Sequence, residues 1–508
     1  MISIKTIKVL SRKSDLAVIQ AKEVGNAIIK KYPNLKIEYI TKSTFGDKDL
    51  TTPLSKMPSP GVFTDDLRED LINNKCDIVI HSWKDLPLIL GNKTFIAGTL
   101  ERADQRDILF VKKNNISKIR MNKKISILSS SPRRIYNLES FAKDFLPFKL
   151  NEINFINIRG NIPTRFKKFI NGTEDSFVVA KAALDRLLNN NSKEHNHLSK
   201  LISTYIEKCY WAITPLSINP TSPGQGALAC EIRNDDDFIC EIIKKINHKN
   251  DFKCVDKERE ILKRYGGGCH QKIGVSFFEM PFGLIHSERG ETENGKNFYS
   301  WKINNDSIKK EKITQQEIYP NSLKDYNLFS RKEIARSIDL INSLRNHCIF
   351  IARKSSLPEK AKIHESNIVW TSGIKTWKDL SKRGIWVNGS TDGMGENLNT
   401  RIENFTVNPW IKLTHVDAPQ SKIKKVIGTY ELSELPIKAD IADKKYFFWM
   451  SSTAFKYVSK NFPNISNANH SCGPGNTYEE IKKTIKDPKK LSIALSYNDW
   501  KKNLLNDS

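Results

Sequence analysis

The chain has 508 residues, 39% of them hydrophobic, and is therefore long enough for about three or four domains, each with its own core. Its net charge is +25, from 82 Lys and Arg against 57 Asp and Glu, which favours anionic partners such as multiply carboxylated small molecules, anionic lipid or nucleic acid. Eight cysteines with no CxxC pair and no His/Cys ligand spacing fit neither a disulfide framework nor a zinc site.

Neither a membrane nor nucleic acid is an expected partner. The first residues, MISIKTIKVLSRKSDLAV, contain no apolar signal-peptide core, and no window approaches about 18 consecutive apolar residues. The lysines are scattered singly, as on solvated faces, and no stripe of basic and aromatic residues predicts a single-strand binder. We therefore expect a cytoplasmic protein.

Up to about residue 235, short apolar runs alternate with amphipathic stretches, a pattern that predicts α/β units. The first set comprises strands at 6–10, 36–40 and 77–81 and helices at 14–31 and 63–73. The second set comprises strands at 125–128, 153–158 and 177–179 and helices at 131–142 and 162–170. Two similar α/β lobes are therefore expected.

The rest of the chain predicts a third unit, a linker and a separate module. A charged helix over 251–264 ends at a glycine run, and KIGVSFF begins a smaller unit. SRKEIARSIDLINSLRN predicts a linker helix, and a fresh α/β pattern starts at residue 347. The expected parts are 1–105 with 200–222 (domain 1), 106–199 with 223–235 (domain 2), 236–325 (domain 3, carrying Cys269), 326–346 (linker) and 347–508 (C-terminal α/β module).

Arginines gather at the predicted ends of elements, beside small or hydroxylated residues. They are Arg12, Arg133, Arg134, Arg159, Arg165 and Arg186. Carboxyl ends of strands and N-termini of helices favour anions, and the planar guanidinium matches a carboxylate with two bonds at once. The set predicts a cleft for a ligand with several carboxylates, and phosphate would fit the same charge.

A carboxylate follows the predicted strand at 77–81, in HSWKDLP. Asp85 lies there beside Lys84, where it could pair with an ammonium group and move protons. The alternative is a turn-forming or capping aspartate, the usual role of a lone Asp in a loop. His81 is expected to be packed or orienting. SPGQGALACEIR lacks the glycine spacing of a nucleotide-binding loop.

One cysteine has unusual surroundings. Cys269 follows three glycines in RYGGGCHQKIGV, a turn that leaves a thiol accessible as a nucleophile or attachment point. A small buried hydrophobe is the other interpretation of a free cysteine, and it suits Cys76, Cys230 and Cys254.

Eight segments in chain order resemble hallmark segments of the hydroxymethylbilane synthases, also called porphobilinogen deaminases. They are VLSRKSDLAVIQA, STFGDKDL, DIVIHSWKDLP, SSSPRR, NIRGNIPTR, VVAKAALDRL, SPGQGALACEIR and KEREILKRYGGGCHQKIGV. The resemblance covers about residues 5–280, with a poorer match to about 320. It implies three α/β domains, the first two similar to type-2 periplasmic binding proteins with the active cleft between them. It also implies a dipyrromethane cofactor in thioether linkage to Cys269.

The same resemblance implies a transferase of tetrapyrrole (haem) biosynthesis. Asp85 would assist loss of ammonia from porphobilinogen and stabilise the azafulvene cation during chain growth; four cycles and a hydrolysis would release linear hydroxymethylbilane. Matching positions assign the cofactor to Cys269, Lys84, Ser130, Ser131, Arg133, Arg134 and Arg159. They assign the substrate to Arg12, Ser14, Lys56, Arg165 and Arg186. Gln20 and Asp47 match as supporting structure, and no metal is implied.

The sequence departs from the family pattern at several positions. Pro60, Asp65, Pro132 and Lys181 replace residues that are usual there, and HQK follows the cysteine where a proline-containing stretch is typical. A proline in a first helical turn is tolerable. We expect these changes to loosen the lid loop or alter the rate, with no core catalytic position lost.

The C-terminal module resembles uroporphyrinogen-III synthase, which closes hydroxymethylbilane into a ring. The matching segments are IVWTSGIKTWKDLSKRGIWVNGS, VIGTYEL, FFWMSSTAFKYV and CGPGNTYEEIKK. The resemblance implies a cleft lined by Thr371, Ser372, Tyr430, Ser451, Ser452 and Thr477, and thus a bifunctional chain. At about 165 residues the module is short for two full domains. A non-catalytic remnant or a docking module is the other interpretation.

A different class of function also fits the first two lobes. A non-catalytic, carboxylate-binding protein of the periplasmic-binding type needs the same cleft, but it needs neither a covalent adduct nor Asp85. The leading expectation is a monomeric enzyme that takes porphobilinogen as its small-molecule substrate.

Overall fold

The computed structural model describes residues 5–44, 46, 61–189, 196–267, 271–304, 313–419 and 421–505. The chain divides into two compact units. One comprises residues 1–143, 148–279 and 286–300, and the other comprises residues 144–147, 280–285 and 301–508. None of the described helices is long and apolar enough to cross a membrane.

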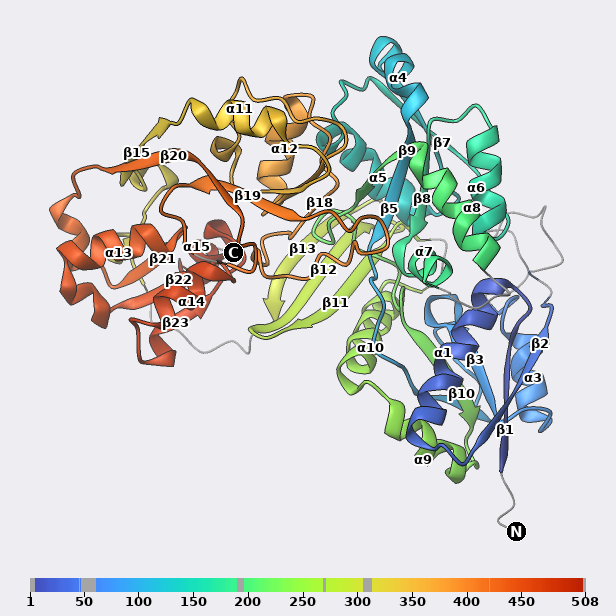
Figure 1. The fold of residues 1–508 in the computed structure, drawn as a ribbon. Coiled ribbons are helices and arrows are strands. Elements are labelled where there is room, and N and C mark those ends of the chain that lie inside the picture. The colour runs from blue at the N-terminus through green and yellow to red at the C-terminus, as the bar shows by residue number, and fades with distance from the viewer. Residues whose placement is uncertain are drawn as a thin grey trace. The chain divides into compact units, whose positions relative to one another are not determined.

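The first lobe is a five-stranded sheet of order β2-β1-β3-β10-β4 (Figure 1). Its elements are β1 (Thr6–Arg12), α1 (Asp15–Lys31), β2 (Lys36–Lys42), α3 (Asp65–Ile72), β3 (Ile78–Ser82), β4 (Thr94–Gly98), β10 (Leu228–Arg233) and α9 (Asp237–Ile246). β1 is parallel to β2 and β3, whereas β10 is antiparallel to β3 and β4. Alternate residues Ile7 and Val9 of β1 belong to the same buried cluster as Val24 and Ile28 of α1, which explains why the sequence periodicity located both elements.

The second lobe repeats the plan, with strand order β7-β6-β8-β5-β9. Its elements are β5 (Asp107–Lys112), α4 (Ile116–Asn122), β6 (Lys124–Leu128), α5 (Pro132–Phe145), β7 (Glu152–Ile156), α6 (Ile162–Asn171), β8 (Ser176–Ala180), α7 (Lys181–Leu188), α8 (Asn196–Glu207) and β9 (Cys209–Ile213). The chain passes from the first lobe to the second before β5 and returns after β9 to form β10 (Figure 1). This confirms the expected α/β class with two lobes of similar plan.

A small antiparallel sheet follows α10 (Lys249–Arg264). It comprises β11 (Gly274–Met280), β12 (Gly283–Glu291) and β13 (Asn297–Asn304), in sequential order. Glu258 of α10 is fully buried and accepts bonds from both terminal nitrogens of Arg102, at 2.7 and 2.9 Å, and from the backbone N–H groups of Gly224 and Phe277. The chain crosses between the lobes twice, before β5 and again before β10, and we call these two segments the lobe crossings. Through Arg102 and Gly224, the Glu258 carboxylate links both lobe crossings to α10 and β11.

The C-terminal unit contains two further sheets. The six-stranded sheet has the order β15 (Phe329–Glu333), β20 (Val426–Glu434), β19 (Trp410–His415), β16 (Cys348–Ile351), β17 (Ile368–Thr371), β18 (Gly389–Ser390). The four-stranded parallel sheet has the order β14 (Ile318–Tyr319), β21 (Tyr446–Trp449), β22 (Asn469–Cys472), β23 (Leu491–Ile493). The helices are α11 (Arg336–Ser343), α12 (Ile374–Lys382), α13 (Ser452–Asn461), α14 (Asn476–Lys482) and α15 (Tyr497–Leu505).

The expected linker helix over 326–346 is correct only in part. Only α11 is helical there, and β15 forms an antiparallel ladder with β20. β14, placed by the sequence in domain 3, pairs with β21. Pairing with a distant strand overrides the helical preference of a Lys- and Arg-rich segment, and local pattern cannot reveal such a partner. The other domain boundaries stay predictions.

Candidate functional site

Lys84 and Asp85 lie in a single 3₁₀ turn, Trp83–Asp85, at the carboxyl end of the central strand β3. Trp83 is 2% exposed and anchors this turn, because its backbone N–H donates to the carbonyl of Ala227 at 3.0 Å. Gly224 has φ +77°, and a side chain there would meet the backbone of Trp83 and Lys84. The glycine-rich segment at 222–227 therefore packs against this turn and holds Asp85 at the strand end, partly exposed.

The neighbouring His81 has a structural role, as expected. It is 4% exposed, and its Nε2 lies 2.8 Å from Oε2 of Glu231. The other carboxylate oxygen of Glu231, Oε1, accepts a bond from Nε of Arg68 at 2.6 Å. Burial alone would raise the pKa of Glu231, but these two hydrogen bonds and charges lower it to about 2. Gln20 is likewise buried and bonds to Ser82 at 2.9 Å, which fits the supporting role expected of it.

Lys84 interacts with two carboxylates and with two arginines of the second lobe. Burial lowers its pKa to about 8; Asp85 and Asp107 oppose that shift, while Arg134 and Arg133 add to it. Its Nζ reaches Oε1 of Gln225 at 3.4 Å. Burial is the main cause of this shift, because the two carboxylates and the two guanidinium groups near Lys84 act on its pKa in opposite directions.

The second lobe contributes further arginines to the same neighbourhood. Arg165, on α6, donates from Nε to the carbonyl of Gly160 at 2.6 Å. Burial lowers its pKa to about 10; Arg134 and Arg159 lower it further, and Asp85 of the first lobe opposes them. Asp85 thus interacts with Lys84 and with Arg165, and Arg165 interacts with Arg134 and Arg159. We call the four basic residues the cationic cleft.

Arg133 and Arg134 are held by a carboxylate that the sequence did not single out. Asp107 is fully buried and lies 3.0 Å from Nη2 of Arg133 and 2.7 Å from Nη2 of Arg134. It also accepts bonds from Asn219 at 3.0 Å and Gln225 at 2.9 Å. Burial would raise the pKa of Asp107, but the two arginines hold it well below its usual range. Gln225 thus connects Asp107 to Lys84.

The other residues predicted to bind carboxylates differ in the contacts that their side chains make. The Oγ of Ser130 both donates to the carbonyl and accepts from the N–H of Ile158, each at 2.8 Å, and Ser131 Oγ accepts from the N–H of Arg134. Ser14 is the N-cap residue of α1. Arg12 ends β1 with its guanidinium carbon 4.4 Å from the ring centre of Phe63.

Arg186 is directed to a different partner. Its Nε lies 3.0 Å from Oε2 of Glu23, on α1 of the first lobe, and its Nη2 donates to the carbonyl of Gly226 at 3.2 Å. The structure therefore places Arg186 at a junction of the two lobes, where the sequence predicted a ligand contact.

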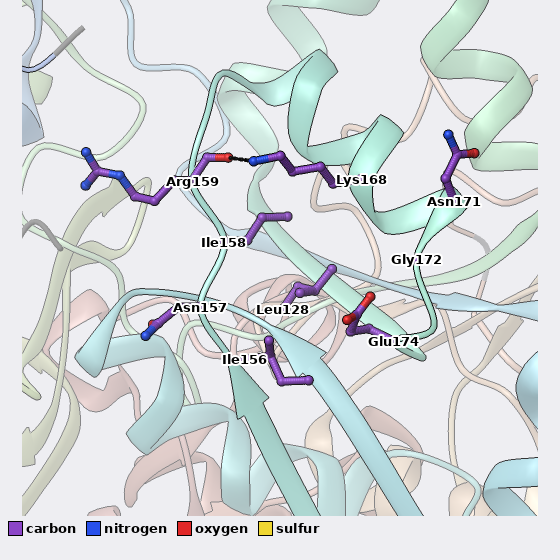
Figure 2. Close-up of a pocket in the computed structure, with 9 residues that line it drawn as sticks. All are labelled: Leu128, Ile156, Asn157, Ile158, Arg159, Lys168, Asn171, Gly172 and Glu174. Carbon is purple, nitrogen blue, oxygen red and sulfur yellow. Dashed lines mark hydrogen bonds between the residues drawn. The ribbon is translucent and has the colours of Figure 1, made fainter. Parts of the chain in front are cut away.

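A pocket of about 380 Å³ lies at the carboxyl ends of β6 and β7, and Figure 2 shows the residues that line it. Lys168 donates to the backbone carbonyl of Arg159 at 3.2 Å. Arg159 also lines this pocket, but its guanidinium points away from Lys168 (Figure 2).

Cys269, Lys56, Asp47 and Pro60 lie outside the described residues. The described chain before Cys269 ends at Gly267, where a side chain would come within 2.6 Å of Cδ1 of Leu88, three residues after Asp85. Arg259 of α10 donates to the carbonyls of Leu86 and Pro87, at 3.3 and 2.5 Å. The glycine turn thus starts beside the loop that carries Asp85. Among the described cysteines, Cys76, Cys230 and Cys254 are buried, as expected.

The departures from the family pattern are accommodated locally. Pro132 is the first residue of α5, a position that needs no N–H donor. Asp65 pairs with Arg68 at 3.1 Å in the first turn of α3. Lys181 is fully buried, and its charge is compensated by Asp185 at 2.6 Å and Asp104 at 3.5 Å.

In the C-terminal unit three of the predicted hydroxyls, those of Thr371, Ser372 and Ser451, lie at or just after the ends of strands. Thr371 is fully buried and bonds to the carbonyl of Gly373, and Ser372 donates to the carbonyl of Ala352 at 2.6 Å. Ser451 is the N-cap residue of α13, accepting from the N–H of Ala454. Tyr430 and Ser452 are each 5% exposed, and Thr477 lies within α14.

Two residues near these hydroxyls escaped the sequence analysis. Arg353 follows β16 and donates to the carbonyl of Met450, after β21 of the other sheet, at 2.9 Å. Burial and the charge of Arg353 lower the pKa of His415, whose Nε2 is buried without a hydrogen bond from the described residues. Arg353 and His415 belong to no motif with a characteristic spacing, so the sequence pattern could not identify them.

The cationic cleft fits a ligand with several carboxylates. Lys84 and Arg165 both interact with Asp85, and cations in partly buried surroundings gain stability from added anions. A metal site finds no such support, since the described residues include no group of three or more potential ligands.

Comparison with known proteins agrees with this chemistry. Residues 7–241 match the family model described as porphobilinogen deaminase, dipyrromethane cofactor binding domain. Proteins named porphobilinogen deaminase are similar in Syntrophomonas wolfei (32% identity over 56% of this chain and 83% of that one), Chlorobium phaeovibrioides (34%, 56% and 82%) and Dictyostelium discoideum (34%, 52% and 76%).

A solved periplasmic sulfonate-binding protein from Methylobacillus flagellatus KT is similar at 13% identity over 51% of this chain and 72% of that one, with a TM-score of 0.28, too low to support an inference. The matches to the deaminases extend over most of the length of those relatives. By these matches, the chain belongs to the porphobilinogen deaminase family, whose cofactor is dipyrromethane.

Proposed function

We propose that this chain is a hydroxymethylbilane synthase. It condenses four porphobilinogen units with loss of ammonia, on a dipyrromethane attached to Cys269, and releases linear hydroxymethylbilane. The observation that carries the proposal is a single carboxylate, Asp85, surrounded by cations from both lobes. Family membership supports the same reaction.

The cations hold the acid arms of the pyrroles. Arg134 of α5, Arg165 of α6 and Arg159 of the loop between β7 and α6 belong to the second lobe, and Lys84 belongs to the first, so one pyrrole chain can contact both lobes. When bound, dipyrromethane supplies the pyrrole carbon to which the units are added. Arg133 and Ser130 make internal bonds, so we assign them to holding the ends of α5 and β6 in place.

The role of Asp85 is to stabilise the positive charge that the substrate carries before and after ammonia leaves. Porphobilinogen brings an ammonium group, and its loss as ammonia leaves a cation on the substrate. The carboxylate of Asp85 pairs with both and can take up and return a proton, while the arginines bind the acid arms and fix the position of the reacting carbon.

Lys84 gives the reaction a pH dependence. Its pKa of about 8 means that the amine is charged below that pH and loses its charge as the pH rises. The KM for porphobilinogen should therefore increase above about pH 8, and Lys84→Arg should delay this increase because guanidinium stays charged. Steady-state kinetics from about pH 7 to about pH 9 test this; identical pH profiles for both proteins would contradict it.

Attachment of the cofactor is tested by intact-mass spectrometry of the purified protein. The wild-type protein should carry an increment equal to one dipyrromethane, and Cys269→Ser should carry none. Cys240→Ser, which changes a partly exposed free thiol, is the matched control and should keep the increment. A wild-type protein without an increment would favour the non-catalytic binding protein instead.

For the C-terminal unit we propose a uroporphyrinogen-III synthase activity that cyclises the released product. Two α/β sheets present strand ends with hydroxyls at Ser372 and Ser451, and Arg353 joins these ends by its bond to Met450. A cation among hydroxyls suits a substrate with many carboxylates. Its linear substrate would be released by the same chain that consumes it.

The isomer of the final product tests this second activity. With porphobilinogen as the only substrate, the wild-type chain should yield the type III isomer. Arg353→Gln should shift the product toward the spontaneously formed type I isomer while porphobilinogen consumption stays unchanged. If the wild-type chain yields only the type I isomer, the cyclase proposal is refuted and the deaminase proposal still stands.

A further inference from the structure

An ion pair connects the two lobes at a residue that we assign to the substrate. Arg186 on α7 directs Nε toward both carboxylate oxygens of Glu23 on α1, at 3.0 and 3.3 Å. The two helices pack against each other although they belong to different sheets. Glu23 therefore occupies the guanidinium edge that an acid arm of a ligand would use.

The two partners differ in burial. The Arg186 side chain is 8% exposed, whereas the Glu23 side chain is 37% exposed. Glu23 can move into water with little loss, because an exposed carboxylate is well solvated. A covered guanidinium left without a carboxylate is destabilised, even though Nη2 keeps the carbonyl of Gly226. The contact between Arg186 and Glu23 is therefore opened most favourably when another carboxylate takes the place of Glu23 on Arg186.

We propose that Glu23 and Arg186 form a clasp between the lobes, which opens when a carboxylate of the substrate replaces Glu23 on Arg186. The inference rests on the proposed function, because it takes porphobilinogen as the source of that carboxylate. Glu23 is then a positioning residue that acts through Arg186. Because Glu23 competes with the substrate for Arg186, it weakens substrate binding. Substrate binding in the cleft is thereby coupled to separation of α1 from α7.

Glu23→Gln removes the competing charge while keeping the size of the side chain. In this variant, amide hydrogen exchange in α1 and α7 should become faster, because the lobes are held together less firmly. The KM for porphobilinogen should fall about threefold to tenfold, within the range of measured ion-pair energies, with kcat changed less than KM. Glu241→Gln, which breaks the exposed pair with Lys244 on α9, is the control and should change neither quantity.

A charge reversal separates a clasp from a static ion pair. Glu23→Arg combined with Arg186→Glu should restore slow exchange in α1 and α7, but it should raise KM strongly because a carboxylate now faces the acid arms. Restoration of both properties would overturn the proposal. Unchanged exchange and unchanged KM in Glu23→Gln would also overturn it. Because hydrogen exchange needs no turnover, the clasp is tested even if the wild-type protein fails to consume porphobilinogen, which would refute the proposed function alone.

Discussion

The organisation of the first unit depends on holding several cations close together in partly buried surroundings. Like charges repel there more strongly than in water, and each guanidinium or ammonium group loses hydration. Asp107 offsets part of this cost: its buried carboxylate takes a bond from each of Arg133 and Arg134. The charge left over around Asp85 then favours an anionic ligand, which is the physical basis of the cationic cleft.

Both lobe crossings are needed to build this arrangement. Asp107 begins β5, directly after the first crossing, and Gln225 lies on the second, where it bonds to Asp107 and receives Lys84. Glu258 ties the same two crossings to α10, the helix that leads to the glycine turn before Cys269. The contacts that position Lys84 are therefore also the contacts that join the lobes to the third sheet. A change at the crossings should affect affinity and stability together.

Much of this could be predicted from local pattern. Strand β1 and helix α1 were located by their periodicity, and the turn at Asp85 by its place after an apolar strand. Asp107 could not be recognised, because its importance comes from Arg133 and Arg134, which lie far along the chain and meet it only after folding. The same holds for Glu23, an ordinary helical glutamate until α7 packs against α1. The strand β15 was mistaken for helix since its partner β20 lies about a hundred residues later.

The most direct test of the account is the rate of porphobilinogen consumption by Asp85→Asn, a change that keeps the size of the side chain and removes its charge. If Asp85 manages the positive charge formed as ammonia leaves, the rate should fall by about 10² to 10⁴. The fold should be unchanged, as judged by the thermal midpoint. A variant that consumes porphobilinogen at the wild-type rate would contradict the central claim.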